Sequence, residues 1–185
     1  MTAELPPAAA WRLLEAHEGF ETVLFRQEAD VVQFEGYSAG VEEGVAWGFR
    51  YELEVDSAWA TRSVRISSSG GRELQLDGDG VGSWLVDGHP APHLEGVLDV
   101  DLEGSACTNC LPIRRLAPAV GERIEAPAAY VRAGELLVER LPQRYRRLDS
   151  GRYDYESPDH GFRAVLAYDE HGLILDYPGI AVRVA

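Results

Sequence analysis

Residues 45–56 read VAWGFRYELEVD, and apolar and charged side chains alternate along this stretch with a period of two. Tyr51, Leu53 and Val55 share one face of an extended chain, and the charged residues between them share the other. Such alternation is typical of a β-strand with one face buried and one face in water. Residues 45–56 therefore predict a half-buried strand, and they favour a mainly β fold.

The same alternation recurs on both sides of this strand. Glycine-rich turns separate the segments, as at residues 69–71 and 78–80. Short spacing of this kind is typical of an antiparallel meander and argues against βαβ units. The expected strands cover residues 20–26, 30–37, 45–56, 59–67, 72–77, 81–86, 97–102, 135–148, 153–155, 162–168, 173–176 and 180–184.

One segment, residues 108–120, interrupts the β pattern. Thr108 or Asn109 can cap a helix, and Pro112 falls near the first turn, where proline is best tolerated. We therefore expect one short α-helix here. The predicted organisation is a single domain, 1–185, made of a lead-in arm (1–19), antiparallel strands (20–107), the helix (108–120) and further antiparallel strands (121–185).

A sheet of about a dozen strands has to curl, because open twisted sheets rarely stay flat beyond about ten strands. One helix is too small to cover its apolar face. A closed barrel, a half-barrel around the helix, or a dimer would each solve this problem. The last two leave a concave apolar surface that suits a lipid or another amphipathic ligand.

The chain is strongly acidic. Its 185 residues include 31 aspartates and glutamates against 17 arginines and no lysine, for a net charge of −14. Such a chain repels phosphate backbones and anionic membrane surfaces, so we expect no nucleic-acid partner. The acidic excess lies in residues 1–110, and it indicates either a solvated acidic surface or a concave site for a polyol, a cation or a sugar.

Two features bear on location. No stretch approaches the roughly 18 apolar residues of a transmembrane helix, so we expect no membrane-spanning segment. The start, Met-Thr-Ala-Glu-Leu-Pro-Pro, lacks the basic region of a secretory signal, and we expect a cytoplasmic protein.

Cys107 and Cys110 form a lone CxxC motif. Zinc sites usually pair two such motifs, although His89 and His93 could complete a set of four ligands. A thioredoxin-like role needs a βαβ context, which the strand pattern does not offer. We expect two semi-buried thiols, with neither a metal nor a cofactor.

Asp99 and Asp101 share one face of an expected strand, about 6.5–7 Å apart at the backbone. This spacing is compatible with an acid–base pair, with a grip on sugar hydroxyls or a metal, or with a solvated strand face. Arg114 and Arg115 project about 100° apart from the expected helix. One arginine could pair with an aspartate and the other could face an anionic ligand, or both could form internal salt bridges.

Three aromatic residues on expected strands are further candidates. Trp47, Tyr51 and Trp84 could stack on a sugar ring or line an acyl groove, because aromatic side chains combine a large apolar area with a polar edge. Aromatic residues on strands are also common core residues, so both interpretations stay open.

Residues 99–116 read DVDLEGSACTNCLPIRRL, and this run resembles the signature of the family named "Putative glycolipid-binding", a bacterial family formerly catalogued as a domain of unknown function. Weaker matches at 47–51, 80–84, 143–145 and 176–179 extend the resemblance to nearly the whole chain. Cys110 departs from the family pattern, in which a small polar residue is expected. The resemblance implies a long antiparallel sheet around one helix, similar to lipoprotein-localisation factors. It also implies a tight homodimer, an acidic pocket and a role in glycolipid metabolism.

Three functions are compatible with these observations. The first is a non-catalytic glycolipid- or lipid-binding protein, whose concave sheet face takes the acyl part and whose polar residues bind the head group. The second is an interaction or scaffold homodimer without a lipid ligand. The third is a hydrolase that uses Asp99 and Asp101 on sugars. The expected ligand-binding residues are Asp99, Asp101, Asn109, Arg114, Arg115, Tyr51, Trp47 and Trp84.

Overall fold

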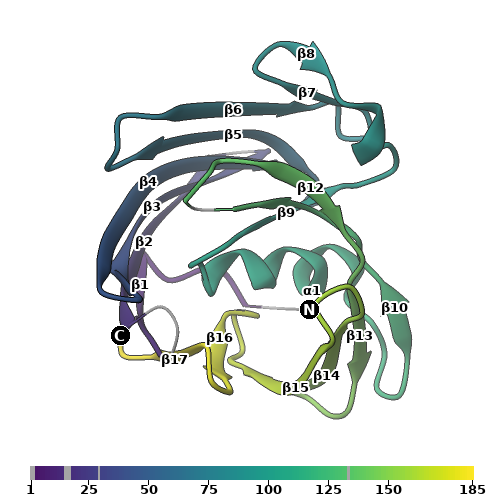
Figure 1. Cartoon of the computed structure of the whole chain (residues 1–185). Coiled ribbons are helices and arrows are strands. Elements are labelled where there is room, and N and C mark those ends of the chain that lie inside the picture. Colours follow the sequence, from purple (N-terminus) through teal and green to yellow (C-terminus); the bar gives the residue numbers. More distant parts are fainter. Residues whose placement is uncertain (1–2, 15–17, 29, 133) are drawn as a thin grey trace.

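The computed structural model describes residues 3–14, 18–28, 30–132 and 134–185. Within these ranges, a curved antiparallel sheet of fourteen strands wraps around one α-helix and a three-stranded sheet (Figure 1). The curved sheet is not closed into a barrel, because β10 and β8 lie at opposite ends of the strand order. The predicted fold class is confirmed.

The main sheet runs in the order β10–β13–β14–β15–β16–β17–β1–β2–β3–β4–β5–β6–β7–β8. Its strands are β1 (Ala8–Leu13), β2 (Glu18–Glu28), β3 (Val31–Glu42), β4 (Val45–Asp56), β5 (Thr61–Ser68), β6 (Glu73–Gly78), β7 (Trp84–Val86), β8 (His89–Pro90), β10 (Arg123–Glu125), β13 (Arg144–Arg147), β14 (Arg152–Ser157), β15 (Phe162–Tyr168), β16 (Ile174–Tyr177) and β17 (Ala181–Arg183). The small sheet holds β9 (Asp99–Leu102), β11 (Ala128–Val131) and β12 (Val138–Leu141). The helices are η2 (Pro92–Leu94), η3 (Cys107–Asn109) and α1 (Cys110–Leu116).

Strand β4 matches the prediction for residues 45–56 at both ends. Tyr51, Leu53 and Val55 are fully buried, whereas Arg50 is exposed. The alternation therefore identifies the buried face correctly, and this face forms part of the hydrophobic core.

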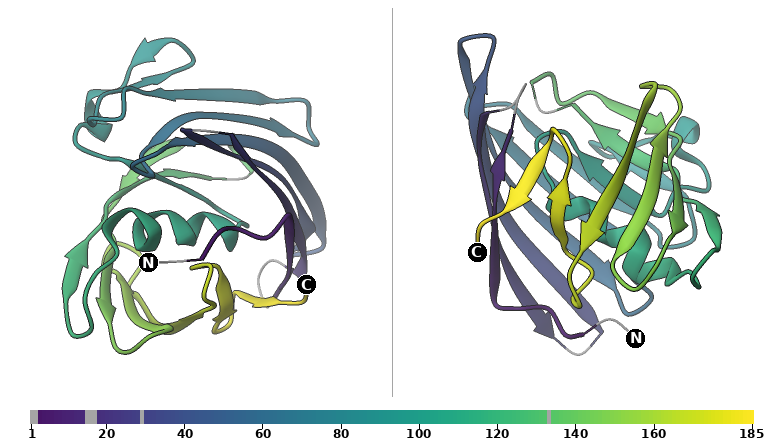
Figure 2. Two further views of the ribbon diagram at one scale, coloured as in Figure 1. Left: turned by 180° about the vertical axis from the view of Figure 1, so that it is seen from behind. Right: turned by 90° about the horizontal axis from the view of Figure 1, so that it is seen from below.

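The lead-in arm predicted over residues 1–19 contains a strand of the main sheet. Strand β1 pairs with β2 on one side and with β17 on the other (Figure 2). Its alternating burial places Ala9, Trp11 and Leu13 in the core, which is why this short segment is held in the sheet. Residues 1–2 and 15–17 of the predicted arm lie outside the described residues.

The α-helix predicted over residues 108–120 is shorter in the structure and begins two residues later, at Cys110. A 3₁₀ turn, η3, leads directly into α1, and α1 ends at Leu116. Ala117 then adopts a left-handed conformation with φ 40°, and its N–H bonds to the Ile113 carbonyl. The following residue is Pro118, which disfavours a helical conformation at the position before it.

The antiparallel meander has one exception. Strand β9 leaves the main sheet and pairs in parallel with β11. Parallel neighbours need a long crossover connection, and the chain between these strands supplies one that contains η3 and α1. The expectation of a purely antiparallel arrangement is therefore wrong at this point.

The strand predicted over residues 135–148 is two strands in two different sheets. Strand β12 pairs with β11, and β13 pairs with β10 and β14. Pro142 lies between them, and a proline cannot donate to a strand ladder. The break lets the chain pass from the small sheet to the main sheet.

The concave side of the main sheet is filled by the chain itself. Helix α1 and the small sheet lie inside the curve in both views (Figures 1 and 2). Leu111 and Ile113 of α1 and Val100 of β9 join Tyr51 and Leu53 in one buried cluster. The concave surface that we expected to take an acyl chain is therefore covered.

Candidate ligand-binding site

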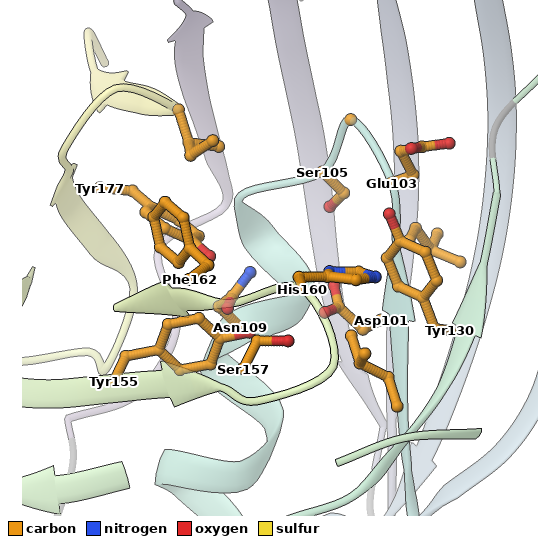
Figure 3. A pocket seen from close by; sticks show the side chains of 14 residues that line it. Asp101, Glu103, Ser105, Asn109, Tyr130, Tyr155, Ser157, His160, Phe162 and Tyr177 are labelled. Atoms are coloured by element: carbon orange, nitrogen blue, oxygen red, sulfur yellow. The ribbon is translucent and has the colours of Figure 1, made fainter. Parts of the chain in front are cut away.

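A cavity of about 210 Å³ opens between the small sheet and strands β14–β16. Asp101 of β9, Asn109 of η3 and Tyr130 of β11 line one part of it. Figure 3 shows Tyr155, Phe162 and Tyr177 gathered at one end and Tyr130 and His160 at the other. The remaining lining residues are Leu102, Glu103, Gly104, Ser105, Leu141, Ser157 and Ile180.

Asp101 is the central polar group of the cavity. Its carboxylate accepts hydrogen bonds from the Gln143 side-chain amide at 2.6 Å and from the Thr108 hydroxyl at 3.2 Å. Burial raises the pKa of Asp101 to about 6, although these two donors lower it. Within the described residues, its direct hydrogen-bonding partners are neutral.

The apolar part of the cavity is a cluster of aromatic rings. The rings of Tyr155, Phe162 and Tyr177 contact one another with centroids 5.8–6.1 Å apart. Tyr130 and His160 form a second, edge-to-face pair at 5.4 Å. A cavity of this kind offers flat apolar surfaces with a few polar groups between them, as small-molecule sites typically do.

A buried glutamate anchors the loop beside the cavity. Glu21 of β2 is fully buried, and its carboxylate accepts hydrogen bonds from the Tyr51 hydroxyl at 2.8 Å and the Ser105 hydroxyl at 2.5 Å. It also accepts from the backbone N–H groups of Ala106 and Cys107, at 2.7 and 3.2 Å. Burial raises the pKa of Glu21, although the hydrogen bonds from these four donors lower it. Glu21 thereby fixes the start of η3 and the position of Ser105 in the cavity wall.

Asp99 does not share the cavity with Asp101. Arg115 covers it with two parallel hydrogen bonds of 2.9 and 2.6 Å, and the Asp99 side chain is 1% exposed. Burial raises the pKa of Asp99, and Arg115 lowers it. The two aspartates do share a strand face, but α1 lies over Asp99, so the pair is not arranged around one ligand.

Arg114 also lies away from the cavity. Its guanidinium stacks on the Trp59 ring at 4.0 Å and donates to the carbonyls of Ala3 and His171. These contacts tie α1 to the turn between β15 and β16 and to the beginning of the described chain. Arg114 and Arg115 therefore point to different places, as their helical spacing predicts.

The three candidate aromatic residues pack in or against the hydrophobic core and do not line the cavity. Tyr51 is fully buried and donates to Glu21. Trp84 is buried, and its indole N–H donates to the Val97 carbonyl at 2.8 Å. Trp47 stacks on Phe49 at 5.9 Å, next to Gly104. Of the eight expected ligand-binding residues, Asp101 and Asn109 line the cavity.

Sequence reasoning missed most of the cavity. The residues that it did not single out include Tyr130, Tyr155, Ser157, His160, Phe162 and Tyr177. For Glu21 the sequence did contain a signal, because the alternating pattern places Glu21 on the same strand face as the buried Val23 and Phe25. A carboxylate on a buried strand face indicates a hydrogen-bonded or functional group.

The sequence predicts neither a metal site nor a membrane-spanning helix, and the described residues bear on both points. Among the described residues, no group of three or more histidine, cysteine, aspartate or glutamate side chains is arranged to hold a metal ion. Cys107 and Cys110 are buried free thiols, and burial raises the pKa of Cys107. No helix in the described ranges has both the length and the apolar character that crossing a bilayer requires.

The comparisons identify the family. A family model described as "Putative glycolipid-binding" matches residues 8–183, which is nearly the whole chain. The chain belongs to this family. The resemblance inferred from residues 99–116 is confirmed.

A solved structure supports the assignment to the "Putative glycolipid-binding" family. The crystal structure of a DUF1089 family protein from Pseudomonas aeruginosa is 37% identical to this chain and superposes with a TM-score of 0.77. The match covers 89% of this chain and 92% of the other. Among curated proteins, none matches the chain.

Proposed function

We propose that this protein binds the sugar head group of a glycolipid in the cavity around Asp101, without catalysing a reaction. The observation that carries the proposal is the combination of the Asp101 carboxylate with the flat faces of Tyr155, Phe162 and Tyr177. A sugar ring has hydroxyl groups at its edge and apolar C–H groups on its faces, so it fits such a cavity. The name of the family supports the same ligand class.

The cavity takes the role of the acidic pocket in this proposal. Asp101 and Glu103 both line it. Its volume of about 210 Å³ suits a head group, and the concave side of the main sheet is filled by α1 and the small sheet. We therefore propose that the acyl chains of the ligand lie outside the cavity. A role in glycolipid metabolism in the cytoplasm is part of the proposal, and the two free thiols are compatible with a reducing compartment.

Replacing Asp101 with asparagine should weaken head-group binding about tenfold or more, because a hydrogen bond to a charged group contributes about 1.5–3 kcal/mol. The measurement is calorimetric titration with n-octyl β-D-glucopyranoside below its micelle concentration. Asp176→Asn is the matched control, since it removes the same charge from an exposed position one residue before Tyr177. Equal affinities of the D101N and wild-type proteins would show that the site assignment is wrong.

We also propose that the protein forms a homodimer through the outer face of β2 and β3. Phe20, Leu24 and Val41 are exposed there, at 59%, 39% and 46%. Native mass spectrometry should give the mass of two chains, and F20D should shift the protein to one chain. Leu175→Asp, at an exposed position on β16, should leave the dimer intact. A wild-type monomer at micromolar concentration would contradict the proposal.

A further inference from the structure

Asp101 brings a negative charge to the cavity, and its hydrogen-bonding partners among the described residues, Thr108 and Gln143, are neutral. Asp101 and Glu103 line it, and among the lining residues within the described ranges there is no arginine. Lysine is absent from the sequence. Asp99, two residues from Asp101, differs in this respect, because Arg115 offsets its charge. The ionised carboxylate of Asp101 would therefore repel a phosphate or sulfate group.

The surroundings of Asp101 favour a positively charged ligand group. Thr108 and Gln143 are neutral donors, and burial makes the ionised carboxylate unfavourable, which is why the pKa of Asp101 rises to about 6. A cation beside Asp101 would relieve this cost by direct attraction. The rings of Tyr130 and Tyr155 also line the cavity, and aromatic faces attract ammonium groups.

An independent observation is the buried hydroxyl of Ser157. Ser157 is 1% exposed and lines the cavity, yet its Oγ makes no hydrogen bond of normal geometry with the described residues. Figure 3 shows this side chain beside those of His160 and Asn109. Buried polar groups are nearly always satisfied in folded proteins. A ligand with several N–H and O–H donors would satisfy Ser157 and Asp101 together.

We propose that the head group bound in this cavity carries a protonated amine, as in an amino sugar, and that the ammonium lies against Asp101. This inference rests on the proposed head-group site and narrows its ligand class. The other hydroxyls of the sugar would then face Ser157 and Asn109, with the ring between the aromatic side chains.

The test compares three soluble probes by calorimetric titration at pH 7.5, each below its micelle concentration. They are n-octyl β-D-glucopyranoside, its 2-amino-2-deoxy counterpart and the N-acetylated form of that amine. The amine should bind about tenfold more tightly than the glucoside, and N-acetylation should remove this gain. The D101N variant should bind the amine and the glucoside equally, whereas the D176N variant should keep the preference for the amine.

The outcomes separate this inference from the proposed function. Equal binding of glucoside and amine by the wild-type protein would overturn the amine proposal and leave the head-group site standing. Binding of none of the three probes would overturn both. The preference for the amine should also fade as the pH falls below about 6, because Asp101 then takes up a proton. His160, Glu103 and Tyr130 are the other titratable groups that face Asp101 in the cavity.

Discussion

Replacing Arg115 with methionine is expected to lower the free energy of unfolding by about 3–5 kcal/mol. Arg115 holds Asp99 through two hydrogen bonds, and the side chains of the pair are only 14% and 1% exposed. Removing one partner leaves the other charge buried without compensation, which costs more than the pair itself contributes. Chemical denaturation of the two purified proteins measures the difference.

The loss in the R115M protein should depend on pH in a defined direction. Burial already raises the pKa of Asp99, and without Arg115 this pKa rises further. Some carboxyl groups have a higher pKa in the folded than in the unfolded protein. Such a group destabilises the fold progressively as the pH rises from the unfolded-state pKa to the folded-state pKa. The R115M protein should therefore be closest to wild type at acidic pH and furthest from it at neutral pH.

A matched control separates burial from charge. Arg123 pairs with Glu156 on the surface, with side chains 57% and 34% exposed. Arg123→Met should cost less than about 1 kcal/mol, because exposed ion pairs contribute little. If R115M and R123M cost the same, the Asp99–Arg115 pair is not the buried anchor described above.

Replacing Glu21 with alanine is expected to cost about 3–5 kcal/mol of unfolding free energy. Four donors converge on this carboxylate, and two of them are backbone N–H groups at the start of η3. Each buried donor left without an acceptor costs about 1–3 kcal/mol. Thermal and denaturant unfolding, followed by circular dichroism, would measure the loss.

Tyr51→Phe is the matched control for Glu21→Ala. It removes one of the four donors and keeps the aromatic ring in the core, so it should cost about 1 kcal/mol. The milder E21Q variant should remain folded but bind the head group less well, because Ser105 in the cavity wall loses its hydrogen bond to a charged acceptor. Unchanged stability of E21A would contradict the anchoring role.

The sequence predicted the strands well because alternation depends on residues close together along the chain. Strand β4 is the clearest case, since the polarity of each side chain indicates whether it lies on the buried or the outer face. The parallel pairing of β9 with β11 was not predictable in this way. Val100 and Ala129 would show the same local pattern in either orientation, and the crossover through α1 decides between them.

The site was predictable only where its residues lie in one dense motif. Asp101 and Asn109 belong to the run that resembles the family signature, and both line the cavity. Asp99 shares the alternation of Asp101, but no local pattern shows that α1 covers only one of the two. The rings of Tyr155, Phe162 and Tyr177 come from distant strands, and only the curl of the main sheet brings them to Asp101.

The pairing of β1 with β17 has a consequence for how the chain folds. Trp11 lies opposite Arg183 in this pairing, and its indole N–H donates to the Ile174 carbonyl, 163 residues further along the chain. Neighbouring hairpins such as β2–β3 and β14–β15 can form locally, whereas the pairing of β1 with β17 has to close a very long loop. Contacts between such distant residues slow folding. We therefore expect the strands on either side of the β1–β17 pairing to form two antiparallel meanders early. The β1–β17 pairing itself should form last, as the rate-limiting event in assembling the sheet.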